Sequence, residues 1–177
     1  MSYDVAALRR AEFPITEQKA YFNNCGISPL PRRSAQAAHE FLDAYMLGGT
    51  AAEMARREML ERTRTKMAAL INASPDEVAF VKNTSEGLGI VAQAVPWEPG
   101  DVVLVAEGEF PAAIYPWRGL PGVELVMVPA PDERITPEIF APYLERGNVR
   151  LVVASWVQFH TGWRTDLAAL SALAHDA

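Results

Sequence analysis

The apolar positions of this chain follow two different patterns, which meet near residue 72. Before that point, apolar side chains recur at the spacing of a helix face, so residues 51–71 are expected to form one long helix. Ser34 is a candidate N-cap of a preceding helix that runs to about Leu47, and the first 13 residues suggest a short helix. Residues 21–31 contain two prolines and a glycine, which prevent regular structure there.

After residue 72, short continuous apolar runs alternate with helical patterns. The runs predict strands at residues 78–81, 102–105, 124–128 and 150–155. The helical patterns predict helices at about residues 85–94, from Pro111, at 136–145 and at 166–175. Strands that alternate with helices, and that are apolar at successive positions, predict an α/β fold with a mainly parallel sheet covered on both faces.

The last helical pattern runs to the end of the printed sequence, at Ala177. In an α/β arrangement the next element should be another strand, so the sequence reads as unfinished. We therefore expect a truncated sheet that leaves an apolar strand edge exposed.

Composition narrows the class of protein. The chain is half apolar and 21% charged, as is typical of a globular protein, and its net charge of −6 argues against a nucleic-acid surface. A single cysteine rules out an internal disulfide framework. The sequence has no apolar run long enough to span a membrane and no secretory signal, so we expect a cytoplasmic protein without a membrane partner. We also expect no metal site.

Two hydroxyl residues, Thr84 and Ser85, stand where the predicted strand at 78–81 leads into a helical pattern. The first amides of a helix have no carbonyl partner within that helix. One interpretation is therefore local: the hydroxyl of Thr84 or Ser85 accepts a backbone N–H and stabilises the helix by about 1 kcal/mol.

A second interpretation is a dinucleotide site. The helix contains GLGIVA at residues 87–92, which matches the G-x-G-x-x-A pattern, and Glu107 follows the next strand. In that pattern the first glycine makes the turn directly after a strand, whereas here residues 82–86 intervene. Gly87 and Gly89 thus fall inside the helix, where we expect them to allow close packing on the sheet.

A third interpretation is a phosphate site. A helix N-terminus offers free N–H groups and the positive end of the helix dipole, and hydroxyls add donors. Two further polar or aromatic segments, residues 107–111 and 155–162, also follow predicted strands. Because ligands in open α/β sheets lie outside the carboxyl ends of the strands, these segments are expected to converge around a flat, phosphorylated ligand.

Four segments carry a resemblance to a known family. They read YFNNCGISPLP at 21–31, PDEVAF and NTSEGL at 75–80 and 83–88, EFP and YPW at 109–111 and 115–117, and VQFHTG at 157–162 with Arg164 and Asp166. In this order, over almost the whole chain, they resemble the class V aminotransferases. These are pyridoxal phosphate (PLP) enzymes that include cysteine desulfurases, kynureninase and isopenicillin epimerase.

The resemblance implies a fold and a set of roles. The fold would be the three-layer, mainly parallel large domain of fold type I PLP-dependent transferases, with residues 1–50 as an N-terminal segment and 51–177 as part of the PLP-binding domain. Thr84 and Ser85 would bind the phosphate, Phe110 would stack on the pyridine ring, and Gln158 would lie beside the phenolic oxygen. Asn24 and Gly26 would lie on the substrate side.

Two residues that the family uses are expected beyond Ala177: an aspartate that pairs with the pyridine nitrogen and a lysine that forms the Schiff base. The lysines of this chain are Lys19, Lys66 and Lys82, and none occupies the family's lysine position. Lys82 precedes the phosphate turn and is interpreted as a loop or surface charge.

The function implied is that of the N-terminal part of a PLP-dependent enzyme acting on an amino acid or related amine, dimeric as a full-length protein. Many family members have a histidine where this chain has Phe110, which argues against a desulfurase because phenylalanine cannot transfer protons. Two alternatives stay open: a truncated, non-catalytic domain that binds a phosphate ligand, and the Rossmann-type dinucleotide-binding domain.

Overall fold

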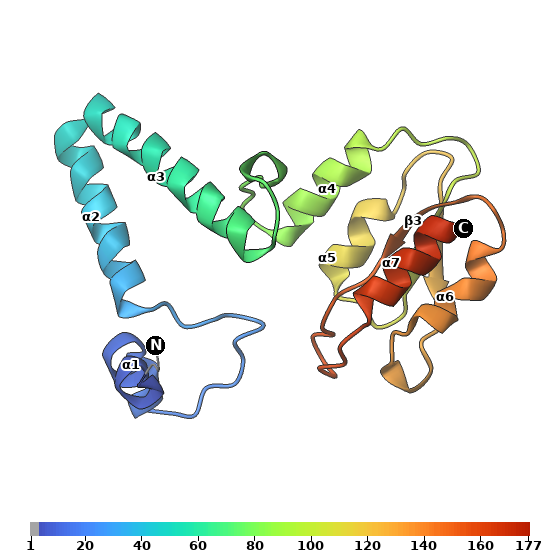
Figure 1. Ribbon diagram of the computed structural model, residues 1–177, viewed down its shortest axis with the longest axis horizontal. Coiled ribbons are helices and arrows are strands. Elements are labelled where there is room, and N and C mark those ends of the chain that lie inside the picture. Colours follow the sequence, from blue (N-terminus) through green and yellow to red (C-terminus); the bar gives the residue numbers. More distant parts are fainter. Residues whose placement is uncertain (1–3) are drawn as a thin grey trace. The chain divides into compact units, whose positions relative to one another are not determined.

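The computed structural model describes residues 4–177, and the chain forms two compact units, Met1–Ala79 and Phe80–Ala177 (Figure 1). The first unit consists of α1 (Val5–Glu12), α2 (Arg32–Gly48) and α3 (Thr50–Leu70), with short 3-10 turns at Pro14–Glu17 and Pro75–Glu77. These helices confirm the three that the apolar pattern predicts. The predicted division after residue 50 stays a proposal about domain organisation, since α3 belongs to the first compact unit.

The start of α2 differs from the prediction. The helix begins at Arg32 with Pro31 as its N-cap, so Ser34 lies in the first turn and is not the cap. The backbone explains the difference, because Pro31 is extended (φ −60°, ψ 145°) and its carbonyl already accepts the amide of Ser34 at 3.0 Å. With Pro31 as the cap, the helix begins three residues earlier than a cap at Ser34 would give.

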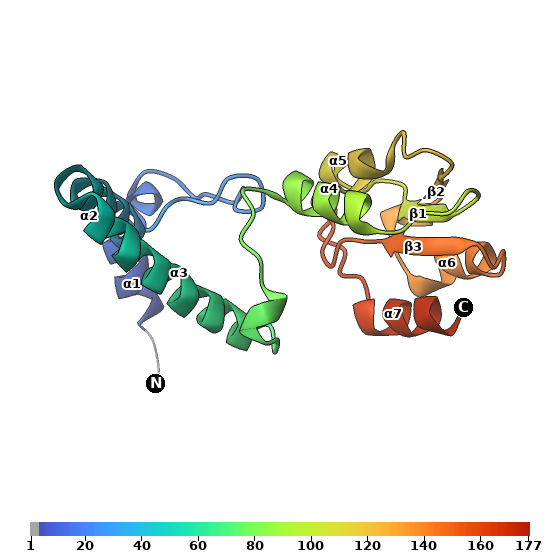
Figure 2. The same cartoon turned by 90° about the horizontal axis from the view of Figure 1, so that it is seen from above.

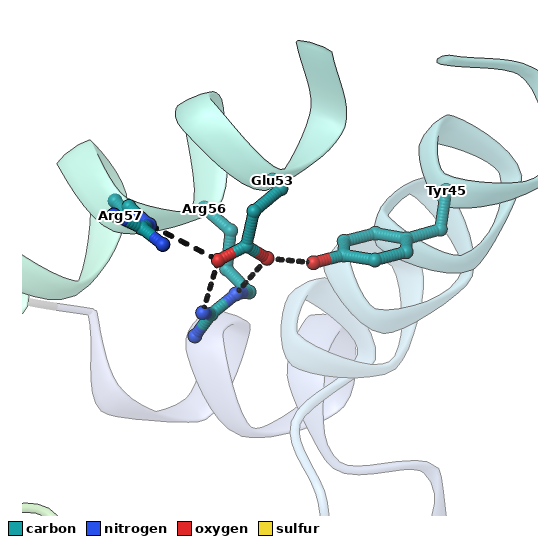
Figure 3. A network of polar contacts seen from close by, with 4 residues as sticks. All are labelled: Tyr45, Glu53, Arg56 and Arg57. Carbon is teal, nitrogen blue, oxygen red and sulfur yellow. Dashed lines mark hydrogen bonds and ion pairs between the residues drawn. The ribbon is translucent and has the colours of Figure 1, made fainter. Parts of the chain in front are cut away.

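The junction between α2 and α3 is held by a polar network around Glu53 (Figure 3). Gly49, with φ 51°, ends α2 and precedes α3. Arg56 donates from Nη2 and Nε to the two Glu53 oxygens at 2.6 and 2.8 Å, and Arg57 Nε donates at 3.2 Å. The Tyr45 hydroxyl of α2 also donates to Glu53. The hydrogen bonds from Arg56, and then those from Tyr45 and Arg57, hold the pKa of Glu53 far below its ordinary value.

Acid should weaken this junction. The pKa of Glu53 is lowered in the folded state. Its contribution to the stability of the fold is therefore complete above the unfolded pKa of about 4.3 and is lost as the pH falls through the folded pKa. We expect Glu53→Gln to melt at a lower temperature than the wild type at neutral pH, with a difference that shrinks progressively in acid. Circular dichroism melts across this pH range measure it. Glu58→Gln is the control, since the Glu58–Arg62 pair is 3.8 Å long and exposed; a pH-independent difference for Glu53→Gln would contradict the assignment.

The second unit is built on a three-stranded sheet in the order β2-β1-β3, with both strand pairs parallel. The strands are β1 (Val102–Ala106), β2 (Glu124–Val128) and β3 (Val149–Val153). Val102 lies opposite Glu124 on β2 and opposite Val149 on β3. The helices are α4 (Thr84–Ala94), α5 (Pro111–Ile114), α6 (Pro137–Leu144) and α7 (Leu167–Asp176), with 3-10 turns at Tyr115–Trp117 and Pro131–Glu133. The predicted parallel α/β architecture is confirmed.

The sheet is the middle of three layers (Figure 2). Every residue of β1 is buried, and its side chains alternate between two core clusters. Val102 and Leu104 pack with residues of α6 and α7, including Phe140 and Leu170. The odd-numbered side chains of β1 pack on the other face with Ala92 of α4 and with Trp117. The continuous apolar run of β1 is thus explained by helices on both faces.

The strand predicted at residues 78–81 is absent from the described part of the chain. A strand requires a neighbouring strand for its backbone, and the sheet formed within residues 4–177 has only β1, β2 and β3. The carbonyl of Val78 instead accepts a hydrogen bond from the Arg64 guanidinium of α3. The prediction from the apolar run was therefore wrong, because the run alone cannot supply the hydrogen-bonding partner.

The outer side of β3 is open. Within residues 4–177, β3 pairs with β1 alone, and a cavity of about 720 Å³ lies between β3 and α7, lined in part by Leu151, Val152 and Leu170. No helix in the described residues is both long and apolar enough to cross a bilayer.

Candidate functional site at the carboxyl edge of the sheet

The first turn of α4 contains Thr84 and Ser85 at its first two positions. The N-cap is Asn83, whose side-chain oxygen accepts the amide of Glu86 at 2.9 Å. The interpretation of Thr84 or Ser85 as the cap is therefore wrong, and capping does not use their hydroxyls. Their amides precede the first carbonyl-to-amide turn of the helix, so they remain available to an anion.

The glycines of α4 do not form a dinucleotide turn. Gly87 and Gly89 lie inside the helix, as the spacing indicates. A Cβ added at Gly89 would meet no atom within 4 Å, and one at Gly87 would make an ordinary contact of 3.6 Å with Val81. The expected close packing is therefore wrong for Gly89, and neither glycine makes the tight turn after a strand that dinucleotide sites require.

Topology brings the predicted site residues to one edge of the sheet. Leu88 and Ala92 of α4 pack on Val103 and Val105, and residues 95–101 connect the end of α4 to the start of β1. The helix therefore runs opposite to β1, and its first turn lies towards the carboxyl end of the sheet. Phe110 follows β1, and Gln158 follows β3, at the same edge.

Aromatic side chains gather at this edge. The ring centroid of Phe110 is 5.2 Å from that of Phe159, in an edge-to-face arrangement, and Phe159 is 4.8 Å from the ring of His160. His160 Nε2 lies 3.5 Å from a Glu133 oxygen, in the turn after β2. Phe110 is 50% exposed, so part of this residue is open to a ligand.

A buried carboxylate, Glu109, joins the segments that follow β1 and β3. Glu109 is 4% exposed. One oxygen, Oε1, accepts the amide of Ser155 at 2.6 Å and Nε2 of Gln158 at 2.8 Å. The other, Oε2, accepts the Ser155 hydroxyl at 2.6 Å and the amide of Phe110 at 3.3 Å. These donors fill both oxygens, as a buried carboxylate requires.

Gln158 is placed differently from Phe110. Its side chain is 2% exposed, its Nε2 is engaged by Glu109, and its Oε1 is buried without a hydrogen-bond partner in residues 4–177. The same edge therefore offers a ligand the half-exposed ring of Phe110, whereas Gln158 faces the interior. A direct contact between Gln158 and a ligand stays a prediction.

The two predicted substrate-side residues lie in the first unit. Asn24 lines a cleft of about 430 Å³ together with Arg9, Phe13 and Tyr21. A Cβ on Gly26 would come within 2.7 Å of the Asn23 amide oxygen, so this glycine leaves room for that side chain. Their approach to Phe110 stays a prediction.

Sequence reasoning missed the roles of Glu109, Ser155 and Phe159. Glu109 follows a buried strand and a turn glycine, Gly108, whose φ is 83°. That position signals a turn at a strand end, but an acidic residue in a turn is ordinarily exposed. Its burial depends on donors 46 to 49 residues later in the chain, which no local pattern reveals.

Comparison with known proteins identifies the family to which the chain belongs. The family described as Aminotransferase class-V matches residues 20–177. A probable cysteine desulfurase of Methanothermobacter thermautotrophicus is 28% identical over 173 residues, covering 94% of this chain and 43% of that protein. A cysteine desulfurase of Klebsiella pneumoniae strain 342 is 32% identical, covering 99% of this chain and 47% of its own length. The chain thus spans about half the length, or less, of these relatives.

Solved structures share the fold. A mutant of C-DES with glycine covalently linked to its PLP cofactor superposes with a TM-score of 0.87 at 23% identity, covering 96% of this chain and 46% of that one. The cysteine desulfurase CsdA of Escherichia coli superposes with a TM-score of 0.84 at 23% identity, covering 99% of this chain and 47% of that one. The chain therefore has the fold type I architecture and covers a little under half of each of these two matched chains.

Proposed function

We propose, because this chain belongs to the aminotransferase class V family, that it forms the phosphate-binding and ring-stacking part of a pyridoxal phosphate site. The enzyme would act on an amino acid or a related amine. The observation that carries the proposal is the pairing of the first two positions of α4, Thr84 and Ser85, whose hydroxyls are not used in the cap, with a half-exposed Phe110 at one edge of a parallel sheet.

The residues present fit this cofactor. The phosphate would receive the amides and hydroxyls of Thr84 and Ser85 at the positive end of α4, which favours an anion. The ring of Phe110 would cover one face of the pyridine, and its packing on Phe159 limits its movement. Bound pyridoxal phosphate supplies an electron sink, while the protein contributes orientation and electrostatics.

The proposal also covers the reaction class. The candidate reactions are transamination, racemisation, elimination and desulfuration of an amino acid. Phe110 carries no titratable group, so a proton moved at that face of the ring must be carried by another residue, which argues against the desulfurase reaction. A homodimer and a cytoplasmic location belong to the same proposal.

A second candidate function, non-covalent binding of a phosphate ligand, is favoured by the state of Lys82. This lysine is 75% exposed and its Nζ lies 3.9 Å from a Glu86 oxygen, one turn into α4. Its side chain lies at the surface, and the other two lysines of the sequence, Lys19 and Lys66, belong to the first unit. On this reading, these 177 residues hold the cofactor without attaching it.

Titration of the 177-residue polypeptide with pyridoxal phosphate tests both candidates. We expect saturable binding by equilibrium dialysis, competition by inorganic phosphate, and no new visible absorbance band, because Lys82, the lysine nearest to the start of α4 along the chain, has an exposed side chain. Lys82→Ala should bind as the wild type does. Absence of saturable binding would refute the proposed site. A stoichiometric visible band that survives gel filtration and disappears in Lys82→Ala would make Lys82 the attachment point.

A further inference from the structure

We infer that Glu109 is a positioning residue of this site: its buried carboxylate sets where Phe110 presents its ring by tying the segment after β1 to the segment after β3. This inference rests on the proposed function, since it concerns how the same edge of the sheet receives a ring. Glu109 itself is 4% exposed and is not expected to touch the ligand.

The contacts of Glu109 connect two separate loops. Phe110 is its immediate neighbour and donates its amide to Oε2, so the carboxylate acts on the backbone from which the stacking ring projects. The other three donors come from the segment after β3, namely the Ser155 amide, the Ser155 hydroxyl and the Gln158 side chain. The 2.6 and 2.8 Å distances of these three contacts are short, as charge-assisted hydrogen bonds are.

The connected segment also holds the second ring of the aromatic group. Gln158 is followed by Phe159, which packs edge-to-face on Phe110. The amide of Gln158 donates to the Trp163 carbonyl at 2.9 Å, and Val157 pairs with Arg164, so residues 157–164 form a tight turn. Holding Gln158 therefore holds Phe159, and Phe159 in turn limits the orientations of the Phe110 ring.

Gly108, next to Glu109, also allows the loops after β1 and β3 to approach each other. A Cβ on Gly108 would approach Cε1 of His160 to 3.4 Å, and the φ of Gly108 is 83°. The loop after β1 thus makes its turn against the loop after β3. Glu109 and Gly108 together bring the two loops into contact from adjacent positions.

The backbone amides of Phe110 and Ser155 require a hydrogen-bond acceptor at each of the two side-chain oxygen positions of Glu109. A carboxylate accepts at Oε1 and at Oε2, whereas a glutamine presents one acceptor and one NH₂ group. In Glu109→Gln, the new NH₂ would replace either Oε2, which accepts the Phe110 amide, or Oε1, which accepts the Ser155 amide. The Ser155 hydroxyl can rotate to accept, but a backbone amide can only donate, so one of the two amides would face the new NH₂. Buried donors that face one another are unfavourable, so the two loops should separate and the ring of Phe110 should lose its fixed position.

The test compares Glu109→Gln with Glu107→Gln in the full chain. Glu107 lies two residues away in the same loop, and its side chain is exposed, so it controls for the change of charge. Two probes are used, pyridoxal phosphate and inorganic phosphate. We expect Glu109→Gln to weaken pyridoxal phosphate binding by about 10-fold or more, because ring stacking is lost. Inorganic phosphate, which depends on α4, should bind with unchanged affinity, and Glu107→Gln should match the wild type with both probes.

Equal affinity of Glu109→Gln and Glu107→Gln for pyridoxal phosphate would overturn the inference while leaving the proposed function in place. A parallel loss of affinity for both probes in a Glu109→Gln variant that keeps the folded circular dichroism signal would also overturn it, because the effect would then not be specific to the ring. If Glu109→Gln does not fold, Ser155→Ala replaces it, since it removes only the hydroxyl contact. It should weaken pyridoxal phosphate binding selectively, but by a smaller factor. A wild type that binds neither probe would refute the proposed function itself.

Discussion

Replacing Thr84 and Ser85 together by alanine is expected to weaken pyridoxal phosphate binding by about 100-fold or more. Each hydroxyl that donates to a charged group contributes about 1.5–3 kcal/mol, and two are removed. Alanine at the first helical positions keeps α4 formed, and its cap, the Asn83 side chain, is untouched. Equilibrium dialysis of the double variant against the wild type measures the effect, and circular dichroism verifies that the helix content is unchanged.

The matched control for this double variant is Ser171→Ala in α7. Ser171 has an exposed hydroxyl, 3.4 Å from His175 Nδ1, far along the chain from α4. It should bind pyridoxal phosphate with wild-type affinity. If Thr84→Ala/Ser85→Ala also retains wild-type affinity, the phosphate is not held at the start of α4, and the assignment of both residues fails.

Leu104→Ala is expected to lower the free energy of unfolding of the second unit by about 2–5 kcal/mol. Leu104 is completely buried in the central strand and belongs to the core cluster with Phe140 and Leu170. Truncation removes apolar area and leaves a cavity between the sheet and the two helices. Since small domains are stable by only about 5–15 kcal/mol, this single change can remove a large part of the stability.

Urea unfolding followed by tryptophan fluorescence measures this loss, because all four tryptophans lie in the second unit. Leu167→Ala is the matched control, as Leu167 is 40% exposed at the start of α7. It should shift the unfolding midpoint much less than Leu104→Ala does. Equal shifts for the two leucines would mean that β1 is not the centre of the core.

The two sets of variants separate stability from ligand binding. The core that Leu104 supports lies between the sheet and α6 and α7, whereas Thr84 and Ser85 are on α4, on the other face. The site therefore depends on residues whose hydroxyls contribute little to the core. A variant that loses affinity without losing stability then identifies a ligand contact.

Most elements of the second unit could be predicted from local pattern. The runs at 102–105 and 124–128 became β1 and β2, because continuous apolar runs of that length match buried parallel strands. The helix predicted at 166–175 became α7, with the Asp166 side chain accepting the amide of Ala169 at 3.0 Å. Such caps are local, and the sequence displays them directly.

Two of the errors depend on surroundings that the local pattern does not contain, whereas the errors about helix caps arise from neighbouring residues. Residues 78–81 are apolar enough for a strand, but no strand within residues 4–177 pairs with them. Gly89 stands where close packing is expected, yet its surroundings are open. Ser34 is a good cap residue, but Pro31 begins the helix first.

The order of the four motifs along the chain was sufficient to identify the family. The alternation of apolar runs with helical patterns predicted the α/β class, the parallel sheet and the strand ends that Phe110 and Gln158 follow, because chain direction in such a sheet sends every strand end to one edge. The sequence also shows that the residue at position 110 is a phenylalanine, which carries no titratable group.

Only the tertiary structure decided which of these side chains are open to a ligand. Phe110 is half exposed, whereas Gln158 is buried against Glu109, although both follow strands in the same way. The physical reason is that burial and hydrogen-bond partners are set by contacts between loops 46 to 49 residues apart. Local pattern reports the preference of a residue for a turn or a helix, and a buried carboxylate becomes favourable only where folding brings enough donors around it.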